Sequence, residues 1–340
     1  MVRMGLSLGL TVAVALAGLS LCTAGMKQYK IIGKVEALDP EFEKLVPRGA
    51  QIEQLAEGFA WTEGPVWIAD QKALLFSDIP NNVVNKWTES KGVEVFIKPS
   101  GYTGTKKRGG EPGSNGLLLD PEGRLVLCEH GDRRITRIEK DGKKTVLADN
   151  YMGKKFNSPN DAVFSSKGEL YFTDPPYGLE KNYDDPAREL DWCGVYRRSP
   201  DGKITLLTKE MSRPNGIALS PDEKTLYVAN SDPFKAIWMA FPINADGSLG
   251  TGKVFYDATP WVKQGRPGLP DGMKVDRAGN IFATGPGGVL VFNPQGKLLG
   301  VINTMDKTSN CAFGGDDGMT LFMTVNHTIA RIRTSTRGLR

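Results

Sequence analysis

The sequence is poor in the residues that soft-metal and disulfide chemistry need. Its 340 residues include two histidines and four cysteines, and no two cysteines have the C-x-x-C spacing of a thiolate metal site. The composition therefore disfavours a zinc centre built from histidine and cysteine. Apart from Cys22 near the N-terminus, the cysteines are Cys128, Cys193 and Cys311, an odd number without paired spacing. We expect buried free thiols; a Cys128–Cys193 disulfide in an oxidising compartment is the alternative.

Three further features are missing, and each excludes a class of protein. No Gly-x-Ser-x-Gly motif is present, which argues against a serine hydrolase. The net charge is only +4, and the basic clusters at 106–108 and 133–134 are short, whereas a nucleic-acid-binding protein carries a longer basic stripe with a recognisable motif. Beyond the N-terminal segment, no stretch keeps the 3.6-residue apolar period of a helix. We therefore expect neither nucleic-acid binding nor a helical fold.

The first 25 residues have the composition of an export signal. Arg3 precedes an uncharged apolar run from Gly5 to Leu21, and residues 22–24 offer a small-x-small cleavage pattern before Gly25. This order predicts a signal peptide over residues 1–25 and a periplasmic or extracellular mature protein without a stable membrane span. An uncleaved membrane anchor and a lipoprotein modified at Cys22 are the alternatives, since the apolar run is barely long enough to cross a bilayer. Residues 26–49 are expected to form an N-terminal extension.

The remaining chain, residues 50–340, is built on one repeated pattern. Its many glycines and prolines punctuate the sequence at short intervals, which favours short strands. Six segments begin with a polar residue, continue with a short apolar run and a turn, and end with a second β-rich run. These polar residues, here called the lead residues, lie 39 to 56 residues apart: Glu63, Asn115, Asn160, Asn215, Asp271 and Asn310. The spacing is the size of a four-stranded blade, so the sequence predicts an all-β, six-bladed β-propeller with four-stranded blades.

The two ends of this domain are expected to meet. The last unit runs out after residues 330–333, which leaves its outermost strand missing. Residues 51–55 precede the first lead residue and have the pattern of a strand. An N-terminal strand that completes the last blade would close the ring, which removes an open sheet edge.

The lead residues are the first candidates for a functional site. The first strand of every propeller blade lines the central channel, so six residues at one register converge on one axis. All six carry side-chain oxygens, two are acidic, and none is Lys or Arg. Turn preference explains single Asn or Asp residues before strands, but not six at one register. A bound divalent cation is the expected source of positive charge. Hard oxygen ligands suit Ca²⁺ best, while Mg²⁺ and Mn²⁺ stay open and Zn²⁺ is disfavoured.

Four ordered motifs give the chain a family resemblance. Glu63-Gly-Pro-Val-Trp, Asn160-Asp, Pro214-Asn-Gly and Pro270-Asp-Gly-Met-Lys-Val-Asp resemble the senescence marker protein 30/gluconolactonase family of metal-dependent lactonases. The resemblance runs from about residue 50 to the C-terminus. It implies that Glu63, Asn215 and Asp271 bind the metal and that Asn160 contacts metal or substrate. Some family members place an arginine two residues before that asparagine to grip a sugar acid; Ser158 stands there in this chain, which departs from that preference.

Further candidates, among them Glu129, His130 and Asp174, lie on the loops between second and third strands, which open at one end of the channel. The metal ligands are expected to be Glu63, Asn160, Asn215 and Asp271. The predicted substrate-binding residues are Asn115, Asp161, Glu129, Asp174 and Arg133. Asp271 is the predicted general base and His130 the alternative, because either could accept the proton of an attacking water.

Together these features predict a hydrolase that opens a small lactone. A central cation would polarise the carbonyl oxygen and activate water, and a small-molecule lactone is the expected partner. A phosphotriesterase or aryl esterase could use the same metal site, because it would also polarise a P=O bond. A propeller that serves as a binding platform around a structural ion is the non-enzymatic alternative.

Overall fold

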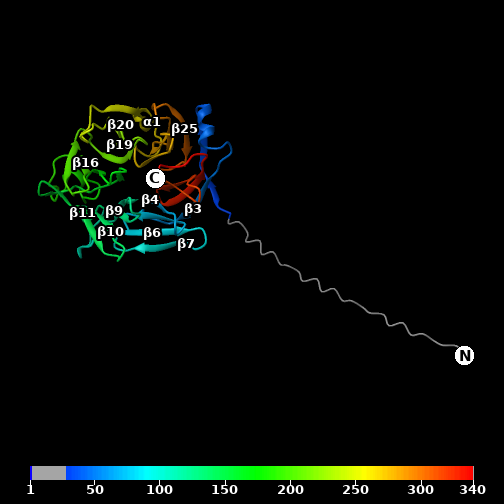
Figure 1. Cartoon of the computed structure of the whole chain (residues 1–340), viewed down its shortest axis with the longest axis horizontal. Coiled ribbons are helices and arrows are strands. Elements are labelled where there is room, and N and C mark those ends of the chain that lie inside the picture. Colours follow the sequence, from blue (N-terminus) through cyan, green and yellow to red (C-terminus); the bar gives the residue numbers. More distant parts are fainter. Residues whose placement is uncertain (2–27, 340) are drawn as a thin grey trace.

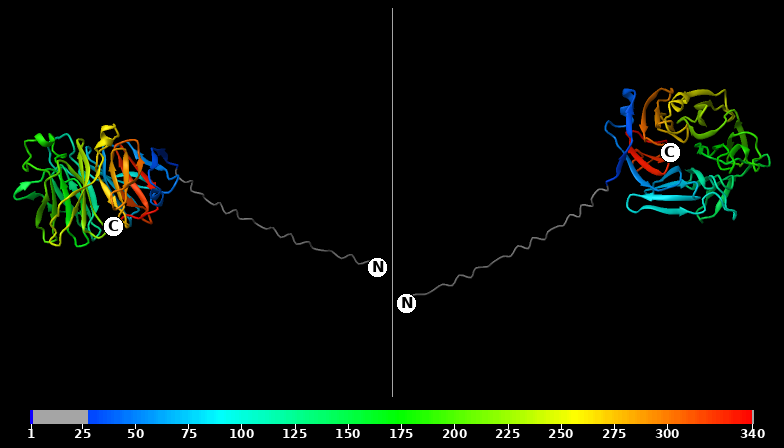
Figure 2. Two further views of the ribbon diagram at one scale, coloured as in Figure 1. Left: turned by 90° about the horizontal axis from the view of Figure 1, so that it is seen from above. Right: turned by 180° about the vertical axis from the view of Figure 1, so that it is seen from behind.

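The computed structural model describes residue 1 and residues 28–339, and it has the predicted architecture of six blades around a central axis (Figure 1). Residues 2–25 of the predicted signal peptide lie outside the described residues. Figure 2 shows the same ring from the side and from behind, with the first blades in cyan and the last in red. In the described part of the chain, no helix is long and apolar enough to cross a membrane.

Each of the first four blades is an antiparallel sheet whose four strands follow one another in the sequence. Blade 1 contains β4 (Thr62–Ile68), β5 (Ala73–Asp78), β6 (Val83–Thr88) and β7 (Gly92–Ile97). Blade 2 contains β8 (Ser114–Leu119), β9 (Leu125–Glu129), β10 (Arg134–Ile138) and β11 (Lys144–Ala148). Blade 3 contains β14 (Ala162–Phe164), β15 (Leu170–Asp174), β16 (Gly194–Arg198) and β17 (Ile204–Thr208). Blade 4 contains β18 (Pro214–Leu219), β19 (Thr225–Asp232), β20 (Lys235–Pro242) and β21 (Lys253–Asp257).

The last two blades each have five strands because the N-terminal extension adds one to each. Blade 5 contains β22 (Met273–Val275), β23 (Ile281–Gly285), β24 (Gly288–Phe292), β25 (Leu298–Asn303) and β2 (Lys34–Ala37). Blade 6 contains β26 (Thr308–Gly314), β27 (Thr320–Val325), β28 (Thr328–Arg333), β3 (Ile52–Glu57) and β1 (Lys30–Ile32). The smaller elements are β12 (Asn150–Tyr151), β13 (Lys154–Lys155), α1 (Thr259–Lys263) and two 3-10 turns, Pro40–Lys44 and Asn182–Asp184.

The closure of the ring is as predicted, because β3 pairs antiparallel with β28 and completes the last blade. The extension goes further than the sequence indicated. Its strand β1 pairs with β3, and its strand β2 pairs with β25 of the neighbouring blade. In Figure 1 this blue segment runs along the outside of the last two blades. Phe42, between the two junctions, is 1% exposed and belongs to the core between blades 5 and 6.

The core lies between neighbouring blades, so the second strand of a blade is covered on both faces. All six residues of β5 and all five residues of β9 are buried. Trp67 of blade 1 stacks on Phe322 of blade 6 with ring centroids 5.0 Å apart, which ties the first blade to the last. The three described cysteines, Cys128, Cys193 and Cys311, are buried and free, as expected.

Candidate metal and active site

Small residues bring the inner strands close together around the axis. A glycine follows four of the six lead residues, and each packs against the next lead residue. A Cβ atom added to any of these glycines would collide with the next lead residue. The distances would be 2.1 Å from Gly64 to Asn115 O, 2.7 Å from Gly116 to Asn160 O, 2.1 Å from Gly216 to Asp271 O and 2.0 Å from Gly272 to Asn310 Cγ. Any larger side chain would push the blades apart. The repeated E-G, N-G and D-G pairs are therefore what allows the lead residues to meet.

Blades 3 and 6 depart from this rule, because Asp161 and Cys311 stand where the other four blades have glycine. The carboxylate of Asp161 enters the ring and accepts a hydrogen bond from Ala162 N at 2.9 Å. Asp161 is 3% exposed. The Asn160-Asp161 pair thus adds a third buried acidic group to the two found among the lead residues.

Hydroxyl groups lock neighbouring inner strands in register. Ser77 Oγ donates to Asn115 O at 2.9 Å, and Thr173 Oγ1 donates to Asn215 O at 2.7 Å. Ser309 Oγ donates to Thr62 O at 2.7 Å and joins blade 6 to blade 1. Because each bond runs from one blade to the next, the lead residues are held on a fixed scaffold.

The acidic groups of the ring repel one another. Burial raises the pKa of Glu63 to about 8, and the charge of Asp161 adds to the effect. Burial also raises the pKa of Asp271 well above its usual value, with further contributions from Glu63, Asp161 and Glu111. A buried cluster of like charges holds protons unless a positive charge compensates it.

One positive charge near the ring belongs to the protein, in addition to the bound cation that the sequence predicts. Burial raises the pKa of Asp161, and the charge of Lys274, three residues after Asp271, partly opposes this rise. Its ammonium group lies 3.1 Å from Met273 O and 3.5 Å from Asn310 Oδ1. The side chain of Asn310 also opposes the rise that burial causes in the pKa of Asp161. The sequence argument considered only the lead positions and so missed this lysine.

Four buried oxygens in the ring have no hydrogen-bond partner: Asn115 Oδ1, Asn160 Oδ1, Asp161 Oδ2 and Asp271 Oδ1. Leaving a buried polar atom unpaired costs about 1–3 kcal/mol. Asn215 donates its amide to Ser231 Oγ at 3.1 Å, which leaves its oxygen for another partner. Carboxylate and amide oxygens are the donors that Ca²⁺ and other hard cations prefer. Within the described residues, His, Cys, Asp and Glu alone form no metal-binding group of three, so amide oxygens would have to complete the set.

His130 lies beside this ring and contacts a residue that the sequence analysis did not single out. Its Nδ1 is 3.1 Å from Glu111 Oε2, and its Nε2 is 3.4 Å from Asn160 Nδ2. The imidazole is completely buried, whereas the Glu111 side chain is 33% exposed. Glu111 comes from the loop before β8, four residues ahead of Asn115. No repeat register marks the position of Glu111, so the sequence pattern gave no signal for it.

The predicted substrate role of Glu129 is contradicted by its surroundings. The side chain is fully buried, and its carboxylate accepts hydrogen bonds from Arg134 Nε at 2.6 Å, Thr136 Oγ1 at 2.8 Å and Lys144 Nζ at 2.5 Å. These partners belong to β10 and β11, away from the axis. Side chains alternate between the faces of a strand, so Glu129 and the following His130 point in different directions.

Asp174 is likewise bonded to its own blade. Its two carboxylate oxygens accept from Asn157 N and Ser158 N, each at 2.8 Å. Asp78 and Asn230, at the same place in blades 1 and 4, accept backbone N–H groups in the same way. Burial raises the pKa of Asp174 to about 7. These residues fix the entry of the inner strands, so the prediction that Asp174 binds substrate is corrected.

Arg133 is also engaged by the protein. Its guanidinium donates to the carbonyl oxygens of Phe156 at 2.6 Å, Ala187 at 2.7 Å and Lys155 at 3.3 Å. The residue is 8% exposed. Arg133 therefore holds two loops of blade 3 together, and the predicted contact with substrate oxygens is not available to it.

Two loops cover the channel end that carries His130. The first lid, residues 98–113, joins blades 1 and 2, and the second lid, residues 175–193, joins the second and third strands of blade 3. Arg108 of the first lid donates to Gly131 O at 3.1 Å and to Gly178 O of the second lid. Gly109 N donates to Glu180 Oε1 at 2.9 Å. The two lids are therefore latched to each other.

The second lid brings a tyrosine to the ring that the sequence did not indicate. Tyr177 is electrostatically coupled to Asp271 and hydrogen-bonds to Ser231, and burial raises its pKa well above the usual value. Ser231 is the residue that binds the amide of Asn215. Tyr177 thus stands beside two predicted metal ligands.

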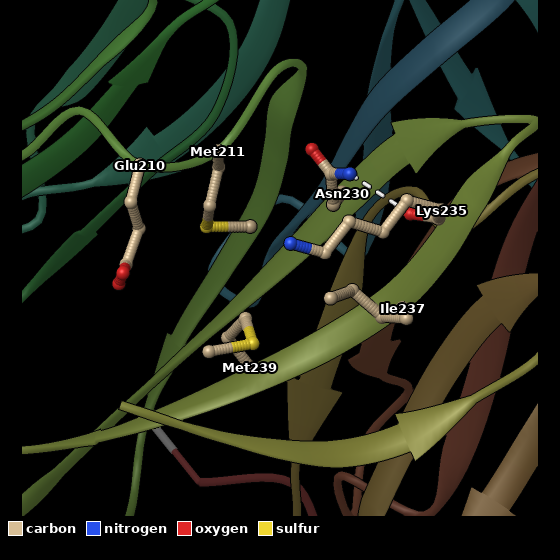
Figure 3. Close-up of a pocket in the computed structure, with 6 residues that line it drawn as sticks. All are labelled: Glu210, Met211, Asn230, Lys235, Ile237 and Met239. Carbon is tan, nitrogen blue, oxygen red and sulfur yellow. Dashed lines mark hydrogen bonds between the residues drawn. The ribbon is translucent and has the colours of Figure 1, made fainter. Parts of the chain in front are cut away.

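Two cavities lie outside the ring. One of about 380 Å³ is formed largely by the first lid, residues 102–108, with Asn82, Pro99 and Pro112. The other, shown in Figure 3, lies against β19 and β20 between Met211, Asn230 and Met239 and measures about 40 Å³. It has room for only a few water molecules, so it is too small for a lactone.

The closed ring of six antiparallel blades, of which four have four strands and two have five, and its oxygen-rich axis define the class: a six-bladed propeller with a buried polar site. Residues 61–327 match the family model described as SMP-30/Gluconolactonase/LRE-like region, and the chain belongs to this family. The resemblance seen in the sequence motifs is thereby confirmed.

Individual relatives agree with this assignment. A gluconolactonase from Zymomonas mobilis subsp. mobilis is 42% identical over 314 residues, which cover 90% of this chain and 88% of that protein. The solved structure of a gluconolactonase from Xanthomonas campestris has a TM-score of 0.78 at 32% identity and covers 92% of this chain and 99% of that one. Regucalcin from Agrobacterium tumefaciens, a calcium-binding protein, has a TM-score of 0.63 at 19% identity, over 84% of this chain and 94% of that one. This last likeness shows the fold alone.

Proposed function

We propose that this chain is a gluconolactonase-like hydrolase that opens a sugar-derived lactone and uses one divalent cation. The cation proposed is Ca²⁺. The observation that carries the proposal is the ring of unpaired buried oxygens at the axis, in a chain 42% identical to a gluconolactonase over 90% of its length. The chain is a lactone-hydrolysing enzyme and thus a carboxylic ester hydrolase. The identity of the cation, its ligands and the particular lactone are the proposed parts.

Glu63, Asn160, Asn215 and Asp271 would hold the cation. Asn160 Oδ1 and Asp271 Oδ1 are buried and unpaired, and the amide of Asn215 is turned toward Ser231. Glu63 accepts a hydrogen bond from Gly64 N at 2.8 Å, which fixes its carboxylate at the axis. When bound, a cation polarises a carbonyl oxygen and lowers the pKa of a coordinated water.

Asp271 is the residue best placed to accept a proton. Hydrolysis adds water to the lactone carbonyl carbon and breaks the ring C–O bond, and the ring oxygen leaves as the new hydroxyl of a hydroxy acid. A base must take one proton from the water and return it to that oxygen. The Oδ1 of Asp271 is buried and unpaired, although the residue as a whole is partly exposed. His130 is completely buried and has Glu111 and Asn160 at its two nitrogens, which favours a different role for it.

The test is a substrate and metal matrix on purified protein. Aldonolactones, aliphatic lactones, aryl esters and a phosphotriester are assayed after EDTA treatment and again after separate addition of Ca²⁺, Mg²⁺, Mn²⁺ and Zn²⁺. We expect aldonolactones to be the best substrates, EDTA to abolish their hydrolysis, and Ca²⁺ to restore it. Faster turnover of the phosphotriester or aryl ester would replace the substrate assignment. Full lactonase activity in protein shown by elemental analysis to be metal-free would end the metal-dependent mechanism.

We also propose that the enzyme acts outside the cytoplasm. Arg3, the apolar run from Gly5 to Leu21 and the small residues that follow support removal of the first residues during export. Substrate and product would then be those of the periplasm or the medium.

A further inference from the structure

The contacts of His130 are unlike those of the other described histidine. His327 is exposed, and its Nδ1 lies 3.0 Å from Phe59 O. His130 is sealed in: Gly178 of the second lid packs directly on it, and a Cβ there would lie 2.6 Å from His130 Cβ. The backbone N–H of His130 donates to Gly113 O at 3.2 Å, two residues after Glu111. The histidine, the first lid and the second lid thus form one packed unit next to Asn160.

We infer that Glu111 and His130 are positioning residues that hold the side-chain amide of Asn160 so that its oxygen faces the channel. The inference rests on the proposed cation site and adds to it the residues that aim one of its ligands. It is carried by two contacts and one unpaired atom: Glu111 Oε2 lies 3.1 Å from His130 Nδ1, His130 Nε2 lies 3.4 Å from Asn160 Nδ2, and Asn160 Oδ1 beyond them is buried and unpaired.

The direction of the chain follows from which atoms can donate. A neutral imidazole has one N–H and one acceptor nitrogen. Glu111 Oε2 is the acceptor beside Nδ1, and that nitrogen has no aligned hydrogen bond in the described structure. The glutamate, which is 33% exposed, therefore has to rotate slightly to accept the N–H of Nδ1. With the proton on Nδ1, Nε2 is an acceptor. Asn160 must then turn its NH₂ group to Nε2 and its oxygen the other way.

Without Glu111 the other tautomer becomes available. A proton on Nε2 would attract Asn160 Oδ1, and the NH₂ group of Asn160 would face the channel. Amide N–H groups repel a cation, so a ligand would be lost although no ligand had been substituted. Partners of this kind, which orient a metal-binding side chain, typically change metal affinity 10- to 100-fold when removed.

The experiment compares calcium affinity, measured by titration calorimetry on EDTA-treated protein, for the wild type and four variants. His130→Phe fills the same space without an acceptor nitrogen, and we expect its affinity to fall about 10- to 100-fold. His130→Gln keeps an oxygen acceptor and should retain most of the affinity. Glu111→Gln should weaken calcium binding, because a neutral amide no longer favours the tautomer of His130 that carries its proton on Nδ1. His327→Ala is the matched control and should bind like the wild type.

A fifth variant tests orientation directly. Asn160→Asp has two equivalent oxygens, so its affinity should not depend on Glu111. We expect Glu111→Gln to weaken calcium binding in the native background and to have little effect in the Asn160→Asp background. Such non-additivity indicates that Glu111 and Asn160 affect calcium affinity through the same interaction. The melting temperature in EDTA, recorded for each variant, separates loss of folding from loss of affinity.

The outcomes distinguish this inference from the proposed function. Wild-type affinity in both His130→Phe and Glu111→Gln would overturn the positioning role and leave the cation site standing. Equal losses from Glu111→Gln in the two backgrounds would also overturn it. A wild-type protein that binds no divalent cation in calorimetry would instead remove the cation site itself. If His130→Phe does not fold, the His130→Gln and Glu111→Gln affinities decide the matter.

Discussion

Gly216 of β18 lies directly against Asp271, the predicted base: a Cβ on this glycine would stand 2.1 Å from the carbonyl oxygen of Asp271. The N-G pair at 215–216 therefore has two functions. Asn215 supplies a side-chain oxygen to the axis, and Gly216 lets the next blade approach closely enough to bring Asp271 to the same place.

We expect Gly216→Ala to be strongly destabilising. The new methyl group would collide with backbone atoms of Asp271 and Gly272, which cannot move without displacing blade 5. Overpacking of this kind costs about 1–3 kcal/mol, and the displaced ring should also lose cation affinity. The measurement is the free energy of unfolding in urea with and without Ca²⁺. Gly109→Ala is the control, because a Cβ there meets nothing within 4 Å; equal stability of the two variants would contradict the close-approach argument.

Asp271 and Glu63 should respond differently to removal of their charge. Asp271→Asn keeps the shape but loses basicity, and we expect lactonase activity to fall by about 10²–10⁴ even at Ca²⁺ concentrations that restore full occupancy. Glu63→Gln should lose affinity and recover activity as Ca²⁺ is raised. The measurement is kcat against Ca²⁺ concentration, with occupancy followed by calorimetry.

Equal recovery of both variants would move the base from Asp271 to another group. Failure of the Glu63 variant to recover at full occupancy would give Glu63 a role in the reaction beyond holding the cation. The His327→Ala protein serves as the reference for unspecific effects at this end of the channel.

The stability of the metal-free protein should fall as the pH rises. Burial raises the pKa of Glu63 to about 8 and also raises the pKa of Asp271 and Asp161. A carboxyl group whose pKa is higher in the folded state binds more protons when folded, so its stabilising contribution is complete below the unfolded pKa and is lost as the pH rises toward the folded one. For Glu63 this window runs from the usual value of 4.5 to about 8.

Melting temperatures in EDTA between pH 5 and pH 8 check this trend. Saturating Ca²⁺ should reverse it, because the cation competes with the protons of Glu63 and binds more tightly at higher pH. Glu63→Gln should flatten the slope in EDTA. A metal-free protein that becomes more stable over this range would contradict the raised pKa values and would indicate that Lys274 compensates the charge of the acidic ring.

The mature protein should begin near Gly25. Cleavage after residues 22–24 would remove the apolar run and leave the extension, whose strands β1 and β2 begin at Lys30 and Lys34, free to dock on the last two blades. N-terminal sequencing of protein from the native host is the measurement. Material that still begins at Met1 would support an anchor, and a lipid-modified Cys22 would support a lipoprotein.

The folded ring could be read from the sequence because a propeller repeats one local pattern. The spacing of the lead residues predicted six blades, and the missing outer strand after Arg333 predicted that Gln51–Leu55 would close the ring; β3 pairs with β28 accordingly. Asn115 was expected near the axis for the same reason, whereas Asp161 was predicted from its place beside Asn160 in the motif of the family resemblance. The alternation of side chains along a strand is a local property of the sequence, and its repetition in six blades makes the pattern easy to recognise.

What the tertiary structure alone decided concerns single side chains outside the repeat. The E-P-G-S-N-G string gives no sign that Glu111 folds back onto His130, because that contact depends on how the first lid crosses blade 2. Glu129 and His130 are neighbours in the chain, yet one is held by Lys144 on the outer strand and the other by Asn160 on the inner ring. The sequence alone determined the blades, their order and the oxygen-rich register, since these follow from strand periodicity. The direction of each polar side chain was decided by which buried partner it meets, and such partners come from distant parts of the chain.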